Sequence, residues 1–451
     1  MRPGMKTLFS KGFPWVVLLA YLFLSLEKNL CLSISFLVLM TGVIVTGLSF
    51  SLFMESKHRK PWSPVLILFV ALVIRLLFVF EQPCLSDDIY RYYVDGTRIL
   101  GMSNPYRTAP ARQQSDDPAF SEILKKVNHP ELVTIYPPAA QLVFALAAFP
   151  GSITGMKVFF VFMDLAVCYM IFLLISRIKV HTDRAVLYAW HPLPVLETAH
   201  SGHIDTAALF FLFAALICFR HRTRLHGMAA GALLAASCLV KLFPLVFVPA
   251  FFLKTLKKER FVPALSFGLT VFLLCLVFLP HMANGVTTLL LYMTDWEFSG
   301  FLFRSLRAMG ISPLTIRILL GSLFVIWIIR CIIAPESTPG ALPLEQLLKS
   351  FYLISLGYLL LTPTIHPWYA LYLVAFIPFS PGVAGICLSW SVFLSYYILI
   401  NYKTLGLWQE ISIIPFLVFA APCLGWTIHI IVSRVRKTNA RSIYLDFSGL
   451  L

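Results

Sequence analysis

Apolar runs of about twenty residues, separated by short polar segments, make up most of this 451-residue chain. A run of this length crosses the hydrocarbon core of a bilayer as one helix. The strict alternation of apolar and polar positions that a membrane β-barrel requires is absent. The pattern therefore predicts an all-α, polytopic integral membrane protein with about 13–14 membrane segments.

Three apolar stretches depart from simple spans. Residues 136–149 are short and begin with Tyr136-Pro137-Pro138, so we expect a segment that re-enters the membrane or lies at its surface. Residues 185–219 should form a hairpin with the polar sequence from His200 to His203 at its tip. Residues 227–253 are interrupted by Lys241-Leu242-Phe243-Pro244, which predicts two short helices with Lys241 between them. Interrupted helices are tolerated where they line a protein cavity.

Lysine and arginine gather in short clusters between the apolar runs, and the formal net charge is +15. Examples are Lys57-His58-Arg59-Lys60, residues 220–224, residues 254–258 and the tail from Arg434 to Arg441. Such clusters favour the cytoplasmic side of a membrane, so both termini are expected in the cytoplasm. Anionic lipid headgroups are the expected counterparts. Nucleic acid is not an expected partner, because no basic groove with stacking aromatic residues is present.

The composition excludes a water-soluble fold. Charged residues make up 13% of the chain and hydrophobic residues 59%, whereas soluble domains carry about 25% charged residues. Most of the nine cysteines lie inside apolar runs, and neither a CxxC motif nor a metal-ligand spacing occurs. No cofactor is firmly implied, and a divalent metal ion is the weaker alternative. The basic N-terminus lacks a small-residue cleavage site, so we interpret it as leading into a retained first helix.

The predicted segments divide the chain into three regions. Residues 1–61 hold two N-terminal transmembrane helices, residues 62–379 form the central membrane core, and residues 380–451 carry C-terminal helices and a basic cytoplasmic tail. Two long segments of the core, residues 81–135 and 281–312, are expected on the extracytoplasmic side. The chain is thus expected to be a multi-pass protein of the inner (plasma) membrane of the cell.

Side chains that can carry chemistry gather in the segments expected to be extracytoplasmic. The sequence from Cys84 to Gly96 brings together three aspartates, one arginine and three tyrosines beside a bilayer that penalises charge. A carboxylate there can act as a general base, and cations can bind a phosphate. The polar residues of this side are Asp87, Asp88, Arg91, Asp95, His129, His200, His203, Asp205, Lys241, Arg304, Arg307 and His366.

Several short motifs, taken in order, resemble the GT-C glycosyltransferases, and above all their bacterial and archaeal mannosyltransferase-like members. The first motifs are Asp88-Ile89-Tyr90-Arg91-Tyr92, Asp95-Gly96, Asn104-Pro105-Tyr106 and Tyr136-Pro137-Pro138. The later ones are His191-Pro192, Gly202-His203-Ile204-Asp205, Lys241-Leu242-Phe243-Pro244 and His366-Pro367-Trp368-Tyr369. The resemblance covers about residues 62–379 and implies a GT-C type fold for that region.

The resemblance also implies a reaction. Such enzymes take a sugar from a polyprenyl-phosphate donor and pass it, with inversion, to a lipid-linked or cell-envelope glycan. The expected sugar is a hexose, with mannose the preferred candidate. An aspartate of the first extracytoplasmic loop would deprotonate the acceptor hydroxyl, and we assign this role to Asp88, with Asp87 as the second candidate. The rival interpretations are a transporter or flippase of a lipid-linked or polar substrate and a catalytically silent membrane scaffold.

The aspartates and the histidine motif leave alternatives open. Either Asp87 or Asp88 can instead cap the following helix. Arg91 can pair with Asp95, four residues further on, or bind the donor phosphate. His203 and its neighbour Asp205 can bind substrate, hold a metal ion or stabilise a helix end.

The remaining candidates are cations and aromatic residues. Lys241 can bind phosphate, or it can extend its charged end out of an apolar run toward water. Arg304 and Arg307 can hold the donor or order the segment 281–312. His366 is a candidate for contact with the phosphate or sugar of the donor, and Tyr136 for contact with the sugar.

Overall fold

The structure of the chain is a computed structural model, and it describes residues 3–53, 61–178, 180–219, 223–254, 260–334 and 343–439. These residues fold into helices and the loops that join them. They contain no β-strand, only isolated bridges from Phe298 and Ser299 to Thr364. The all-α prediction is therefore confirmed. The basic cluster from Lys57 to Lys60, on which much of the predicted sidedness rests, lies outside the described residues.

Seven helices of the described part are long and apolar enough to cross a membrane. One further pair, Pro192–His200 with Asp205–Phe219, meets the same test together but is bent by 120° at its break. Five shorter apolar helices of 10–17 residues accompany the long ones. The prediction of a polytopic membrane protein is confirmed, with part of the predicted segments folded as short helices. The seven spans are Ile34–Leu52, Ile153–Ile175, Phe261–Asp295, Pro313–Ile333, Pro343–Leu361, Val383–Leu405 and Ile413–Ile431.

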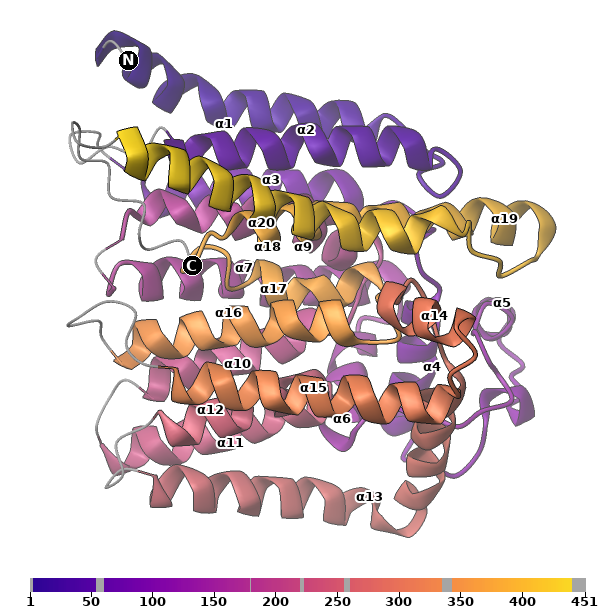
Figure 1. Cartoon of the computed structure of the whole chain (residues 1–451). Helices are drawn as coiled ribbons and strands as arrows, with labels where there is room; N and C mark the ends of the chain where they lie inside the picture. Colours follow the sequence, from indigo (N-terminus) through magenta and orange to yellow (C-terminus); the bar gives the residue numbers. More distant parts are fainter. Residues whose placement is uncertain are drawn as a thin grey trace. The chain divides into compact units, whose positions relative to one another are not determined.

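The helices group into two compact units, each assembled from separate parts of the sequence. The first unit comprises Met1–Ser63, Ile175–Leu193 and Glu297–Leu451, and the second comprises Pro64–Leu174 and Pro194–Trp296. Figure 1 labels their helices. The division into three regions at residues 61 and 379 stays a prediction.

The first unit is a bundle of spans with short helical connections. Within it, α18 packs against α20 and α2, and α15 packs against α16. The hydroxyl of Tyr21 in α1 donates to the carbonyl of Trp190 at 2.8 Å, which ties the N-terminal helix to this bundle. Its elements are α1 (Pro3–Ser25), α2 (Ile34–Phe53), η2 (Thr182–Ala185), α8 (Val186–Ala189), α14 (Phe301–Ala308), α15 (Pro313–Ile333), α16 (Pro343–Leu361), η6 (Pro367–Ala370), α17 (Leu371–Val374), α18 (Val383–Ser391), η7 (Val392–Tyr397), α19 (Ile398–Leu405) and α20 (Ile413–Asn439).

The second unit contains the long polar loop that follows α3. Here α11 packs against α10, α13 and α6, and α4 packs against α6. Its elements are α3 (Pro64–Val79), α4 (Asp88–Leu100), η1 (Pro110–Arg112), α5 (Pro118–Leu124), α6 (Pro138–Ala148), α7 (Ile153–Ile175), η3 (Val195–His200), α10 (Asp205–Phe219), α11 (Arg224–Val240), η4 (Phe243–Phe247), α12 (Val248–Leu253) and α13 (Phe261–Asp295).

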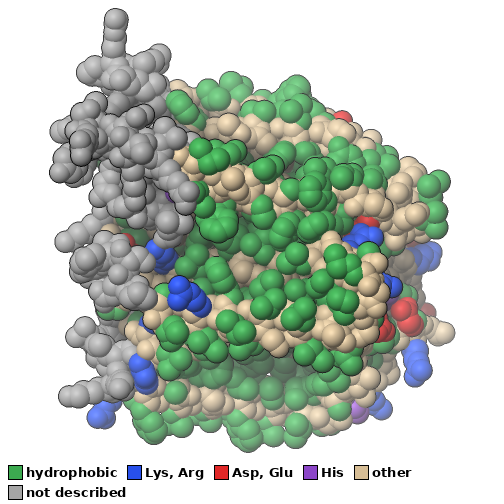
Figure 2. Space-filling view, in the orientation of Figure 1, with side chains coloured by type: hydrophobic (Ala, Val, Ile, Leu, Met, Phe, Trp, Pro, Cys, Tyr) green, Lys and Arg blue, Asp and Glu red, His purple; other side chains and the backbone are tan. Residues whose placement is uncertain are grey.

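Hydrophobic side chains cover much of the helical surface, as Figure 2 shows for one face of the molecule. On α15, for example, Leu314, Ile318 and Ile326 each expose more than 60% of their surface. Contiguous apolar surface of this kind is unfavourable in water and is the surface expected against lipid.

Two contacts in the second unit fix helices that carry the polar loop. Gly96 lets α4 approach α6 closely, because a Cβ atom at this position would lie 2.3 Å from the carbonyl oxygen of Phe144. Arg75 of α3 pairs with Asp164 of α7 at 2.5 Å, and both side chains are fully buried. Since either charge alone would be costly in an apolar interior, the pair holds α3 against α7.

The interruption predicted at Lys241 is confirmed. The helix α11 ends at Val240, and the short helices η4 and α12 follow from Phe243. The first arm of the hairpin expected over residues 185–219 is not one continuous helix. It consists of short pieces that end in the π-helical turn η3, because Pro192 and Pro194 remove backbone donors there.

The segment 281–312, expected as a loop, is helical over most of its length, in α13 up to Asp295 and in α14 from Phe301 to Ala308. The helix α13 continues through Pro280 to Asp295, and Figure 1 shows that it turns before its C-terminal end. A proline inside a helix removes one hydrogen bond and kinks the helix. In the part of α13 after Pro280, Gly285 lies against the ring of Tyr106.

Candidate functional site

The helix α4 presents two neighbouring carboxylates where the polar loop enters it. Asp87 occupies the N-cap position, but its side chain makes no capping hydrogen bond. Asp88 lies in the first turn, and its backbone amide donates to the hydroxyl of Ser86 at 3.3 Å. The carboxylate of Asp88 is 19% exposed, so it is held by the protein and still open to water.

Neutral donors from three parts of the second unit converge on the Asp88 carboxylate. The amide of Asn128 donates to Oδ1 at 2.9 Å. The hydroxyls of Tyr92 and Tyr136 each lie 3.4 Å from Oδ2. Nδ1 of His203 lies 3.8 Å from the same oxygen. The arrangement orients a carboxylate to which no arginine or lysine of the described residues is bound directly.

The two tyrosines act on Asp88 as neutral donors. Burial, followed by the nearby Tyr136 and Asp88, raises the pKa of the Tyr92 hydroxyl well above its usual 10.0. Burial, followed by the charge of Asp88, does the same to the pKa of Tyr136. Their oxygens are 3.2 Å apart, and their rings meet edge to face with centroids 5.0 Å apart. Both hydroxyls therefore keep their protons at neutral pH.

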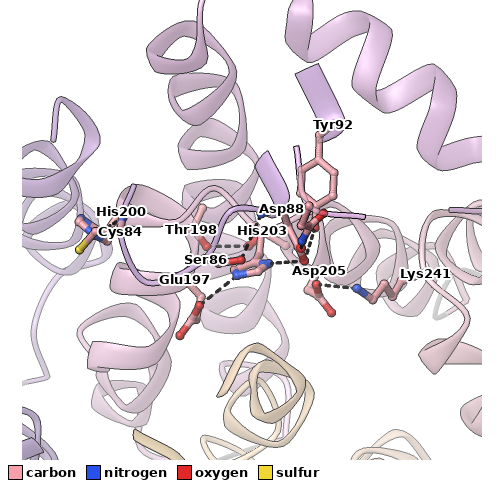
Figure 3. Close-up of polar contacts among 12 residues, drawn as sticks. Cys84, Ser86, Asp88, Tyr92, Glu197, Thr198, His200, His203, Asp205 and Lys241 are labelled. Atoms are coloured by element: carbon pink, nitrogen blue, oxygen red, sulfur yellow. Dashed lines mark hydrogen bonds and ion pairs between the residues drawn. The ribbon is translucent and has the colours of Figure 1, made fainter. Parts of the chain in front are cut away.

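A buried carboxylate and imidazole lie behind Asp88 (Figure 3). Nε2 of His203 lies 3.4 Å from Oε2 of Glu197, and the two side chains are at most 1% exposed. The turn between them depends on Gly202, whose φ of +74° is rarely adopted by other residues. A Cβ atom there would also lie 2.3 Å from the side chain of Ile89.

On the other side of Asp88, a lysine and an aspartate form an ion pair. Nζ of Lys241 lies 3.3 Å from Oδ2 of Asp205, which is fully buried, whereas the lysine side chain is 17% exposed. The ammonium group also lies over the ring of Tyr136, 5.3 Å from its centroid. Because the break after α11 frees this lysine from the helix, a partly exposed cation sits beside the carboxylate of Asp88.

Arg91 uses its guanidinium to shape the loop. It donates to the carbonyls of Leu132 at 2.9 Å, Asn128 at 3.2 Å and His129 at 2.7 Å. Its charge also opposes the effect of burial on Asp95, where burial raises the pKa of a fully buried carboxyl group. These contacts favour a role for Arg91 in positioning Asn128 beside Asp88.

Lys157, a single cation within the apolar helix α7, holds the entry to the loop. Its ammonium group donates to the carbonyls of Phe78 at 3.1 Å and Glu81 at 2.7 Å. Nearby, Nε2 of His200 lies 3.4 Å from Sγ of Cys84. The segment that leads to Asp88 is thus fixed from two sides.

The remaining predicted residues belong to the first unit. Arg304 pairs with Glu410, and Arg307 pairs with Glu297. The imidazole of His366 stacks between Phe298, at 4.6 Å between centroids, and Trp368, at 4.4 Å. Arg304 also lines a cavity of about 250 Å³, together with Phe301, Ser305, Ala308, Ser412 and Pro415.

Sequence reasoning missed Glu197, Asn128 and Lys157. Lys157 carried a signal, since a lone lysine in an apolar run needs a partner. Glu197 and Asn128 carried little signal in the sequence, because each can be recognised only from its contact with His203 or Asp88 in the folded chain. Within the described residues, no three histidine, cysteine, aspartate or glutamate side chains are placed to hold a metal ion.

One comparison with known proteins identifies the type of enzyme. Residues 134–341 match the family model for glycosyltransferase family 87, a family of GT-C-type polytopic membrane enzymes. The chain is a glycosyltransferase of the GT-C type. No curated protein and no solved structure matches it in the two other comparisons. The match favours the enzyme over the transporter or flippase that the sequence left open.

The family match covers part of the cluster around Asp88. It includes Tyr136, the segment from Glu197 to Asp205, and Lys241. Asp88 and Asn128 precede it, and the structure brings them to those matched residues.

Proposed function

We propose that this glycosyltransferase is an inverting enzyme that uses a polyprenyl-phosphate sugar as its donor. The sugar is a hexose, with mannose the first candidate, and the acceptor is a lipid-linked or cell-envelope glycan. The reaction takes place at the extracytoplasmic face of the inner (plasma) membrane, and Asp88 is the general base.

The observation that carries the proposal is the environment of the Asp88 carboxylate. It is partly exposed, and it accepts hydrogen bonds from Asn128 and the two tyrosines without a cation bound to it directly. Such a carboxylate can accept a proton from an acceptor hydroxyl. The deprotonated oxygen attacks the anomeric carbon, and the bond to the donor phosphate breaks on the opposite side of that carbon.

A leaving phosphate needs positive charge near it. Lys241 supports this part of the proposal, because its partly exposed ammonium group lies over the ring of Tyr136 and pairs with the carboxylate of Asp205. An ammonium group on a flexible stem binds phosphate as a point charge. A donor carried by a lipid also accounts for an active site built in a membrane protein.

The test is sugar transfer by membranes that contain the enzyme, with a panel of polyprenyl-phosphate sugars and lipid products measured by mass. We expect Asp88→Asn to lower kcat by about 10²- to 10⁴-fold, the range for loss of a general base. Asp116→Asn serves as the matched control, because this aspartate is exposed in the same loop. It should transfer sugar at the wild-type rate.

Asp87→Asn decides between the two carboxylates. A large loss in this variant with an active Asp88→Asn enzyme would move the base to Asp87. Full activity in both variants would exclude a base at this position. Transfer from nucleotide sugars alone would contradict the polyprenyl-phosphate donor.

A further inference from the structure

The buried carboxylate of Glu197 lies behind the base and takes no part in the reaction proposed above. It belongs to the π-helical turn η3 and is fully buried. A π-helical turn is rare and is frequently found at functional sites. Here the turn brings the carboxylate of Glu197 within 3.4 Å of Nε2 of His203.

We propose that Glu197 and His203 form a proton-holding pair for Asp88. His203 takes from Asp88 the proton that the acceptor hydroxyl has released, and Glu197 is the positioning residue that orients the imidazole. The inference rests on the proposed function, because it needs Asp88 as the base.

The geometry places the three groups in one line from the exposed base to the interior, as Figure 3 shows. Oδ2 of Asp88 faces Nδ1 of His203 at 3.8 Å, and Nε2 of the same ring faces Glu197. The separations are longer than good hydrogen bonds, and catalytic hydrogen bonds commonly shorten in the complex with substrate. The backbone supports this line, because the amide of His203 donates to the carbonyl of Glu197 at 2.8 Å.

The carboxylate of Glu197 selects one form of the imidazole. A carboxylate only accepts hydrogen bonds, so it favours the ring with a proton on Nε2. Nδ1 then presents a lone pair to Asp88. This form cannot donate to a charged Asp88, but it can accept a proton from Asp88 once that group has become a carboxylic acid.

The proton is accounted for at each step. The O–H bond of the acceptor breaks, and its proton moves to Oδ2 of Asp88 as the new glycosidic bond forms. The bond between the anomeric carbon and the phosphate oxygen breaks, and the electron pair leaves with the phosphate. The proton then moves from Asp88 to Nδ1 of His203, where the resulting imidazolium lies between two carboxylates. After product release it returns through Asp88, which is 19% exposed, to water.

Several titratable groups face this line and enter its pH dependence. Asp88 and Tyr92 come from α4, Tyr136 precedes α6, and Asp205 begins α10. Lys241 offsets the charge of Asp205. A change confined to Glu197 leaves all of these groups in place.

The experiment measures kcat, the KM for both substrates and the pH dependence of kcat for Glu197→Gln. We expect kcat to fall about 10- to 100-fold, the range for loss of a histidine-orienting partner, while both KM values stay unchanged. The acidic limb of the profile should move to lower pH by about one unit or more, because an adjacent anion favours the imidazolium. A merely structural role would not move this limb.

Ser201→Ala is the matched control. Ser201 directly follows the same turn and is buried, and its hydroxyl has no hydrogen-bond partner among the residues that the structure describes. Its removal should leave kcat and the pH profile as in the wild type. Should Glu197→Gln not accumulate in the membrane, Glu197→Asp decides instead. It keeps the charge, so a lower kcat with an unmoved acidic limb supports the pair, and a wild-type kcat overturns it.

The outcomes separate this inference from the proposed function. Loss of transfer in Asp88→Asn, together with a wild-type kcat and pH profile in Glu197→Gln, overturns the proton-holding pair and leaves the base in place. An active Asp88→Asn enzyme overturns the proposed base and the pair with it.

Discussion

Asp88 and Asp164 are two carboxylates of one protein with different partners. Asp164 is paired with Arg75 in a fully buried contact that joins two helices. Asp88 instead meets two tyrosines, an asparagine amide and an imidazole. Its neutral hydrogen-bond donors orient the carboxylate while leaving it able to accept a proton.

Lys241 can be tested as a phosphate ligand. We expect Lys241→Gln to raise the KM for the donor about 10- to 100-fold, because a hydrogen bond to a charged group contributes about 1.5–3 kcal/mol. The KM for the acceptor should stay unchanged. Steady-state transfer with varied donor concentration measures both values.

Asp205→Asn is the matched control for Lys241, since it removes the partner and keeps the ammonium group. The donor KM of this variant should not rise. An equal rise in both variants would assign the effect to the lost ion pair rather than to phosphate binding.

Tyr136 gives a pH-dependent contribution to stability. Burial raises the pKa of its hydroxyl above the usual 10.0, so the folded protein holds this proton more tightly than the unfolded chain does. The contribution is therefore full below about pH 10 and is lost as the pH rises through the pKa of the folded state. We expect the unfolding temperature in detergent to fall as the pH rises above about 10, and to fall less in Tyr136→Phe.

Tyr169→Phe is the control, because Tyr169 is exposed. This variant should show the same fall in unfolding temperature as the wild type. Equal falls in the wild type and in Tyr136→Phe would contradict the assignment.

At the residue scale, the sequence could predict the types of side chain at the site better than their roles. The motif from Asp88 to Tyr92 contains the proposed base. The position of Glu197 could not be predicted, because the sequence around it, with a histidine and two prolines, has no periodic pattern of apolar residues. The partners of Arg304 and Arg307 could not be foreseen either, since Glu410 lies more than a hundred residues from Arg304.

At the scale of elements, the contact between α4 and α6 holds Asp88 opposite Tyr136. A Cβ atom on Gly96 would lie 2.3 Å from the Phe144 carbonyl oxygen, which cannot move without displacing α6. We expect Gly96→Ala to lower both the unfolding temperature and kcat. Gly101→Ala is the matched control, because the nearest atom to its added Cβ lies at 3.4 Å and is the carbonyl oxygen of Thr97.

Thermal unfolding and transfer assays on the two glycine variants test this contact. A stable and fully active Gly96→Ala enzyme would show that the close approach of α4 and α6 is not needed to position the site.

Helix boundaries were predictable where the sequence interrupts a helix strongly. The lysine and proline of Lys241-Leu242-Phe243-Pro244 ended α11 as expected. Pro280 was a poorer guide, because a helix can continue past one proline when the following residues favour it. The expectation of a loop from residue 281 was therefore wrong up to Asp295, and again over α14 from Phe301 to Ala308.

At the scale of the whole molecule, hydrophobic composition and the spacing of apolar runs were enough to predict an all-α membrane protein. They could not predict the grouping of the helices into two units, because each unit joins distant parts of the chain. The cluster around Asp88 lies entirely in the second unit. Arg304, Arg307 and His366 lie in the first.

The bend of α13 has a consequence for where the base sits relative to lipid. The twenty residues from Phe261 to Pro280 rise about 30 Å, the thickness of the hydrocarbon layer. Beyond Pro280, Gly285 meets the ring of Tyr106, whose hydroxyl donates to the carbonyl of Tyr136 beside Asp88. Another side of this part exposes Val286, Leu290 and Met293.

A helix with one apolar exposed side and one side packed on a loop rests in the boundary between headgroups and acyl chains. The second part of α13 would then set the position of the neighbouring loop relative to the membrane. It would fix the distance of Asp88 from the surface of the bilayer. The hydroxyl of a lipid-linked acceptor would reach Asp88 only if it lies at the same distance from that surface.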